Sequence, residues 1–149
     1  MPDIVPHSRG VRFRCKNQWL DEHSQPILDE IRTVDLYAVD GATVCDMTSQ
    51  KIAAYGDLHY PQTKFGSIGI RVEPRLLPPF GGTIIGDDNR RGKADLITET
   101  ESNFVAYENS LPNDQTFGVF LSLPYENKRG PWFIRDYGMA MHNPTWVTD

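Results

Sequence analysis

Alternation of apolar and polar residues, with a period of two, is the dominant pattern along the chain. In "VRFRCK" the residues Val11, Phe13 and Cys15 alternate with three basic residues, and "GSIGIRV" and "TFGVFLSLP" repeat the pattern. Residues two apart lie on the same face of a β-strand, so each stretch predicts a half-buried strand. The apolar positions of the last two stretches are Ile68, Ile70, Val72, Phe117, Val119, Leu121 and Leu123.

Turn residues separate these stretches and favour an antiparallel arrangement. Asp40-Gly41 in "AVDGATV" is the preferred pair for a two-residue type I′ hairpin turn. The stretch "SQPILDEIRTV" fits either a helix capped by Ser24 or a strand, and we favour the strand because "TVDLYAV" follows it. Twelve glycines and eleven prolines are consistent with many short connections. The predicted fold class is all-β, an antiparallel β-sandwich or a partly open barrel.

Length and charge restrict the classes of protein that fit. At 149 residues and 16.9 kDa we expect a single domain over 1–149, with 1–10 as a flexible N-terminal arm. A net charge of −5 argues against a nucleic-acid partner, and no apolar run approaches the roughly 20 residues of a membrane-spanning helix. "MPDIVPHSRG" lacks the hydrophobic core of a secretion signal, so the default expectation is a cytoplasmic protein.

Few residues suggest metal, cofactor or nucleophile chemistry. Cys15 and Cys45 are too few for a metal knuckle, and we interpret both as small core residues in a reducing compartment, with a bridge between them left open. Asp57 and His59 in "DLHY" would share one face of a strand, but such pairs are common by chance. The chain has no HExxH, CxxC, GxSxG or phosphate-loop motif. We therefore predict no metal and no cofactor.

The segment "RGPWFIRDYGMAMHNP", residues 129–144, has the densest set of candidate residues. Read as one continuous strand, it places Phe133, Arg135 and Tyr137 on one face, an aromatic platform with a fixed cation. That chemistry suits a sugar, a carboxylate or a phosphate. Alternatively, Arg135 forms a salt bridge to a neighbouring strand and Tyr137 belongs to the core. His142 and Asn143 follow the strand, as residues of either a binding loop or an ordinary turn.

Three stretches resemble consecutive blocks of the PmoA-like family, whose members often have the label "methane oxygenase PmoA". They are "KFGSIGIRV", "SNFVAYENSL" and "FGVFLSLPYENKRGPWFIRDYGMAMHNP". The positions that match the family blocks are Lys64, Gly66, Arg71, Val72, Val105, Tyr107, Pro124, Asn127, Pro131, Trp132, Arg135, Asp136, Tyr137, Gly138, Asn143 and Pro144. The resemblance extends over residues 11–146 and corresponds to the C-terminal half of the relatives, which are about twice as long.

The resemblance implies a large β-sandwich of the galactose-mutarotase-like kind, and hence carbohydrate binding or processing. The family label does not imply a copper-dependent membrane enzyme here. Leu123 and Phe133 stand where the family blocks have histidines, Phe104 stands where tryptophan is usual, and a histidine-rich segment of the relatives is missing. If those histidines are acid–base or metal residues, this chain lacks them.

The first hypothesis is therefore a non-catalytic carbohydrate-type binding or assembly domain, for a carbohydrate or a small acidic ligand. Its candidate ligand-binding residues are Arg135, Tyr137, Arg71 and Lys64, followed by His59, Asn127 and His142. The alternative is a sugar-processing enzyme, a hydrolase or epimerase, with His59 or His142 as general base and Asp57, Asp136 or Glu108 as its partner. A third hypothesis is a structural fragment that only packs against a partner chain. A half-size sandwich leaves a sheet face or edge uncovered, so we also expect a homo-oligomer.

Overall fold

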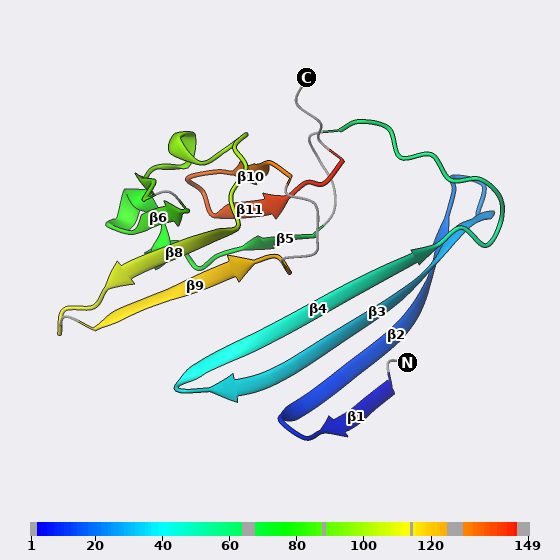
Figure 1. The fold of residues 1–149 in the computed structure, drawn as a ribbon, viewed down its shortest axis with the longest axis horizontal. Coiled ribbons are helices and arrows are strands. Elements are labelled where there is room, and N and C mark those ends of the chain that lie inside the picture. The colour runs from blue at the N-terminus through cyan, green and yellow to red at the C-terminus, as the bar shows by residue number, and fades with distance from the viewer. Residues whose placement is uncertain (1–2, 64–67, 88, 114, 125–129, 146–149) are drawn as a thin grey trace. The chain divides into compact units, whose positions relative to one another are not determined.

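The computed structural model is all-β, and its strands form antiparallel sheets (Figure 1). It describes residues 3–63, 68–87, 89–113, 115–124 and 130–145. The chain divides into two compact units, residues 1–59 and 60–149. This division does not test the expectation, based on chain length, that residues 1–149 form a single domain, and that expectation stays a prediction. In the described part of the chain, no helix is long and apolar enough to cross a membrane.

The first unit is a four-stranded meander in the order β1-β2-β3-β4. Its strands are β1 (Asp3–His7), β2 (Gly10–Leu20), β3 (Pro26–Val39) and β4 (Ala42–Ile52). The turn between β3 and β4 has positive φ at Asp40 (45°) and Gly41 (81°), which confirms the predicted two-residue hairpin. The ambiguous stretch after Ser24 is strand β3, as favoured. Residues 3–7, expected within a flexible arm, pair with β2 instead.

The two faces of this sheet differ in polarity. The strand register shows which residues share a face, because directly opposed residues point to the same side. One face has the ion pairs Arg12–Asp35 (2.6 Å) and Lys16–Asp29 (3.0 Å). The other has an apolar row that crosses all four strands, because Ile4 is opposite Phe13, Phe13 opposite Val34, and Val34 opposite Met47. We call these four residues the apolar row; a second row beside it consists of Pro6, Val11, Leu36 and Cys45.

The two cysteines lie on this apolar face but are not core residues. Cys15 on β2 is half-buried, Cys45 on β4 is exposed, and both are free thiols. They are opposite different residues of β3, Arg32 and Leu36. The prediction of two core cysteines was wrong for Cys45, because β4 is an edge strand and its face has no second layer within this unit.

The second unit has two small sheets, in the orders β7-β6-β8-β9 and β10-β11-β5. Its strands are β5 (Ile68–Arg71), β6 (Thr83–Gly86), β7 (Arg91–Gly92), β8 (Phe104–Ser110), β9 (Thr116–Ser122), β10 (Trp132–Ile134) and β11 (Met139–His142). The described residues also form the short 3-10 helices η1 (Pro74–Leu76), η2 (Pro78–Phe80) and η3 (Ala94–Leu96). The Pro-rich segment "RLLPPFGG", residues 75–82, overlaps η1 and contains η2, and its Leu76 and Leu77 are buried.

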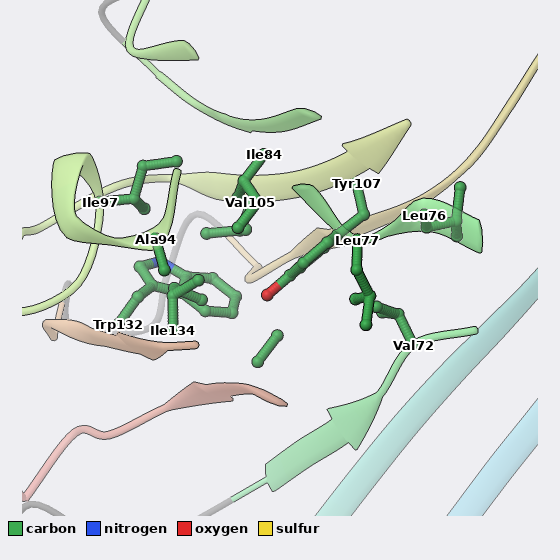
Figure 2. Packing of buried hydrophobic residues seen from close by; sticks show 11 residues of the cluster. Val72, Leu76, Leu77, Ile84, Ala94, Ile97, Val105, Tyr107, Trp132 and Ile134 are labelled. Atoms are coloured by element: carbon green, nitrogen blue, oxygen red, sulfur yellow. The ribbon is translucent and has the colours of Figure 1, made fainter. Parts of the chain in front are cut away.

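A hydrophobic core lies between these sheets, as in a β-sandwich (Figure 2). Its buried members are Val72, Leu76, Leu77, Ile84, Ala94, Ile97, Val105, Tyr107, Trp132, Ile134 and Ala140. Phe117, Val119, Leu121 and Leu123 pack against this core, which confirms that they share one side. The buried polar atoms are paired: the Tyr107 hydroxyl donates to the Met139 carbonyl (3.2 Å), and Trp132 Nε1 donates to the Ser102 carbonyl (2.8 Å).

The described residues 130–144 form a hairpin and not the single strand expected from the alternation of the segment 129–144. The chain reverses between β10 and β11 in a turn formed by Arg135, Asp136, Tyr137 and Gly138. The Gly138 amide donates to the Arg135 carbonyl (2.9 Å), the Arg135 amide donates to the Met139 carbonyl (2.9 Å), and Gly138 has φ of 91°. A type I turn followed by a left-handed glycine has this bonding pattern.

Candidate functional site

Several residues of the segment 129–144 hold the fold together. The Asp136 carboxylate accepts a hydrogen bond from the Ala94 amide (2.8 Å) at the start of η3, which ties the hairpin turn to a distant loop. Asn143 is fully buried: its Nδ2 donates to the Thr63 carbonyl, and its Oδ1 accepts from the Thr145 amide (3.1 Å) and hydroxyl (2.8 Å). These side chains satisfy backbone groups, so their role in this structure is positional.

His142 is also a packing residue in this structure. It is 6% exposed, and its ring lies edge-on to Trp132 with 5.4 Å between the ring centroids. Its Nε2 accepts a hydrogen bond from the Gly130 amide (3.1 Å), and burial lowers the pKa of the imidazole. A Cβ atom on Gly130 would lie 3.0 Å from this Nε2 and 2.8 Å from the Asn143 carbonyl oxygen, so only glycine fits there. The histidine is held neutral, with Nε2 already used.

The acid–base pair required by the enzyme hypothesis is not formed among the described residues. His142 bonds to a backbone amide and not to a carboxylate. Of its suggested partners, Glu108 forms an ion pair with Arg91, and Asp136 accepts from a backbone amide. His59 is exposed at the end of the first unit, and Asp57, two residues earlier, is exposed as well. No group of three His, Cys, Asp or Glu that could hold a metal occurs in the described ranges.

Three of the predicted ligand-binding residues come together at one end of the sheet β10-β11-β5. Arg71 on β5 is opposite Met139 on β11, and the Arg135 amide bonds to the Met139 carbonyl. Arg135 is therefore opposite Met139, one step beyond the β10–β11 pair Ile134–Ala140. Opposed residues point to the same face, and neighbouring strands are about 5 Å apart, so two arginines flank one methionine at a backbone separation of about 10 Å. We call Arg71, Met139, Arg135 and the adjacent Tyr137 the arginine row.

Both guanidinium groups of the arginine row lie over aromatic rings. Arg135 Cζ is 3.8 Å from the centroid of the Phe133 ring, and Arg71 Cζ is 5.3 Å from that of the Tyr137 ring. Arg135 also donates from Nη1 to the Ile134 carbonyl (3.0 Å) and the Thr98 hydroxyl (3.3 Å), which fixes its orientation. Tyr137 is 53% exposed, and Arg71 is exposed too. The sequence-based alternative, with Tyr137 in the core, was therefore wrong.

Neither guanidinium of the arginine row has a carboxylate partner among the residues that the structure describes. Other described arginines of the same unit do: Arg75 pairs with Glu73 (2.6 Å), Arg90 with Asp87 (2.8 Å), and Arg91 with Glu108. The row is therefore a positively charged surface with accessible donor groups. Lys64 and Asn127, also predicted to bind ligand, lie outside the described residues.

Sequence reasoning missed a polar cluster on the first unit. The Glu30 side chain is 2% exposed and accepts hydrogen bonds from four side chains. The donors are Ser49 Oγ (2.6 Å), Arg32 Nη2 (2.9 Å), Asn17 Nδ2 (3.1 Å) and Trp19 Nε1 (3.1 Å). Although burial opposes ionisation, these donors lower the pKa of Glu30 to about 2. The cluster spans three strands, and only the strand register could have revealed it.

Comparison with known proteins assigns the chain to a family by sequence. No curated protein and no solved structure is significantly similar to this chain. The proposed PmoA-like resemblance is not tested by these comparisons and stays a prediction. The model of one family, described as a family of unknown function (DUF6807), matches residues 2–149. The chain therefore belongs to the DUF6807 family.

Proposed function

We propose that this protein is a non-catalytic binding domain that holds an acidic carbohydrate, or another small carboxylate-bearing ligand, at the arginine row. The observation that carries the proposal is the pair of exposed or half-exposed guanidinium groups without a carboxylate partner among the described residues. Each lies over an aromatic ring, at 3.8 Å for Arg135 and 5.3 Å for Arg71.

The chemistry of the row favours an acidic sugar over a neutral one. A guanidinium offers paired donors that match the two oxygens of a carboxylate, and such charge-assisted bonds are stronger than neutral ones. The exposed ring of Tyr137 and the thioether of Met139 add an apolar surface against which a sugar ring can pack. An anionic group of the ligand would supply the carboxylate partner that Arg75, Arg90 and Arg91 already have.

The same geometry argues for binding without catalysis. Of the two histidines considered as a general base, His142 is buried against Trp132, and His59 is exposed with no carboxylate at hydrogen-bond distance among the described residues. A general acid or base needs a titratable group within hydrogen-bond reach of the reacting atoms. At the arginine row the described groups are guanidinium, phenol and thioether, none of which suits that role near neutral pH.

The proposal is tested by measuring the binding of oligogalacturonate, a uronic-acid oligosaccharide, by isothermal titration calorimetry, beside a neutral cello-oligosaccharide of equal length. We expect the acidic sugar to bind and its affinity to fall as salt is added. Arg135→Ala should weaken binding by about 10- to 150-fold, because a hydrogen bond to a charged group contributes about 1.5–3 kcal/mol. Arg71→Ala should have an effect of the same order.

Arg75→Ala provides the matched control. Arg75 also lies over an aromatic ring, Phe117, at 5.4 Å, but it is paired with Glu73. Its removal should leave the affinity unchanged. Equal binding of the acidic and the neutral sugar, or an Arg135→Ala variant that binds as the wild type does, would refute the proposal.

A further inference from the structure

Strand β4 is a long edge strand of the sheet in the first unit. In the described part of the chain β4 pairs only with β3, and its other side has no backbone hydrogen bond to another strand. The strand is 11 residues long and none of its residues is buried. Unpaired amide and carbonyl groups along an edge of this length are a template for another strand.

The two edges of this sheet are protected to very different degrees. Strand β1 at the opposite edge has five residues and includes Pro6, which removes a backbone donor. Strand β4 contains no proline, no glycine and no register shift against β3. Its two charged residues both contact side chains of their own sheet: Asp46 accepts from the Tyr37 hydroxyl (2.7 Å), and Lys51 lies over the Trp19 ring (5.4 Å). Edge β4 therefore lacks the short length, the proline and the bulge that protect many strand edges.

A second copy of the same strand is complementary to this edge. The middle residue of Ala42–Ile52 is Met47, so antiparallel pairing over the full length places Met47 opposite itself on a two-fold axis. In that register Asp46 is opposite Thr48 of the second copy, and Lys51 is opposite Thr43. No two like charges face each other directly. The two Asp46 carboxylates lie diagonally, and each already accepts a hydrogen bond from Tyr37 of its own sheet.

The apolar row supports the same register. It crosses the sheet from Ile4 through Phe13 and Val34, and it ends at the open edge with Met47. Ile4 is 62% exposed and Met47 is 38% exposed, so both ends of the row are uncovered. A two-fold axis through Met47 joins the rows of two copies end to end, on the same face of one eight-stranded sheet. The pairing thus adds cross-strand apolar contacts to the backbone hydrogen bonds.

We propose that two copies of this chain associate through antiparallel pairing of β4 with β4, centred on Met47. The proposal is independent of the ligand assigned to the arginine row, because that row lies in the second unit. It makes the first unit the assembly module of the protein. The partner is a second copy because the edge is complementary to its own sequence in length, in charge and in the position of the apolar row.

Charge substitution at the axis tests the proposal on the full chain. Light scattering after size exclusion should give twice the 16.9 kDa chain mass for the wild type. Met47→Lys and Met47→Glu should each be monomeric, because identical charges then face each other. An equimolar mixture of the two variants should recover the dimer, because opposite charges meet. Recovery in the mixture also shows that the single variants are folded.

The matched control is the other end of the same row. Ile4→Lys and Ile4→Glu place the same charges on β1, at the opposite edge, and should leave the dimer intact. A monomeric wild type at every concentration would overturn the proposal, as would Met47 variants that stay dimeric. Loss of the dimer in the Ile4 variants alone would assign the association to the other edge and would also overturn it.

A cysteine at the axis tests the register. Directly opposed residues have Cα atoms about 4.5–5.5 Å apart, which suits a disulfide. Met47→Cys combined with Cys45→Ser should therefore give a covalent dimer on a non-reducing gel after mild oxidation. The native Cys45 should not cross-link to its counterpart, because the two are displaced by four residues, or about 13 Å along the strand. Spontaneous linkage through Cys45 would refute pairing centred on Met47.

Discussion

At the scale of single residues, the segment 129–144 separates into two groups. Trp132, Asp136 and Asn143 each hydrogen-bond to a backbone group elsewhere in the fold. Replacing them removes partners of backbone atoms and should lower stability. Arg135 and Tyr137 instead present a guanidinium and a phenol ring to solvent, so changes there should affect binding more than folding.

Glu30 provides the first stability prediction. Glu30→Gln removes the charge on which Ser49, Arg32, Asn17 and Trp19 converge, and leaves an amide hydrogen facing donors. Losing a buried acceptor of this kind should cost about 3 kcal/mol in the free energy of unfolding at neutral pH. Urea denaturation of the wild type and the variant measures this difference. Glu22→Gln is the matched control, because its side chain is 87% exposed.

The difference in unfolding free energy between the wild type and Glu30→Gln should depend on pH. The pKa of Glu30 is about 2 in the folded protein against 4.5 for the reference carboxyl, so the unfolded chain takes up the proton first. The stabilisation is complete above pH 4.5 and is lost as the pH falls towards 2. The wild-type and Glu30→Gln stabilities should converge over this interval. A difference that stays constant down to pH 2 would contradict the ionised, hydrogen-bonded carboxylate.

At the scale of elements, alternation correctly assigned residues to faces even where it missed a turn. Phe133 is opposite Met141, and Ile134 is opposite Ala140, across the β10–β11 hairpin. Opposed residues in this register have both odd or both even numbers, so the reversal preserves the alternation. A period of two therefore cannot distinguish the hairpin from one continuous strand. The composition of "RDYG", with glycine at the left-handed position, is the local signal that could have indicated the turn.

Gly138 makes this turn testable. It has φ of 91°, and a Cβ atom there would lie 2.9 Å from Leu77 Cδ2 and 3.2 Å from Val72 Cγ2, both in the core. Gly138→Ala should lower the free energy of unfolding by about 1–3 kcal/mol through backbone strain, plus the cost of displacing those side chains. Gly41→Ala is the control for strain alone, since its φ is 81° but nothing lies within 4 Å of the added atom. Equal losses in thermal or urea unfolding would show that the packing contribution is absent.

The rest of the candidate site could not be predicted, because it is formed by residues that are distant from one another in the sequence. The sequence indicated Arg71, Arg135 and Tyr137, and the register of β5 and β11 brings them to one end of a sheet. It did not indicate that His142 faces the core, because a histidine at a strand end fits either side. The Glu30 cluster joins residues from β2, β3 and β4, and no local pattern contains that information.

At the scale of the whole molecule, burial is unevenly distributed. Among the described residues, the core of the second unit has eleven buried hydrophobic members. In the described part of the first unit only Leu28, Asp29 and Glu30 are buried, while Ile4, Val11 and Met47 remain exposed on one face. A single-layer sheet gains little from its own apolar residues. The amides of its edge strand β4 should therefore be protected from hydrogen exchange largely by association with a second copy.

Hydrogen exchange followed by mass spectrometry can separate the two contributions. We expect the amides of β8, which contains the buried Val105 and Tyr107, to exchange slowly and independently of protein concentration. The amides of β4 should exchange more slowly as the concentration rises, because a second strand then covers them. Met47→Lys should abolish this dependence in β4 and leave β8 unchanged. If β4 exchange is the same in dilute and concentrated wild type, its edge is not the surface through which two copies meet.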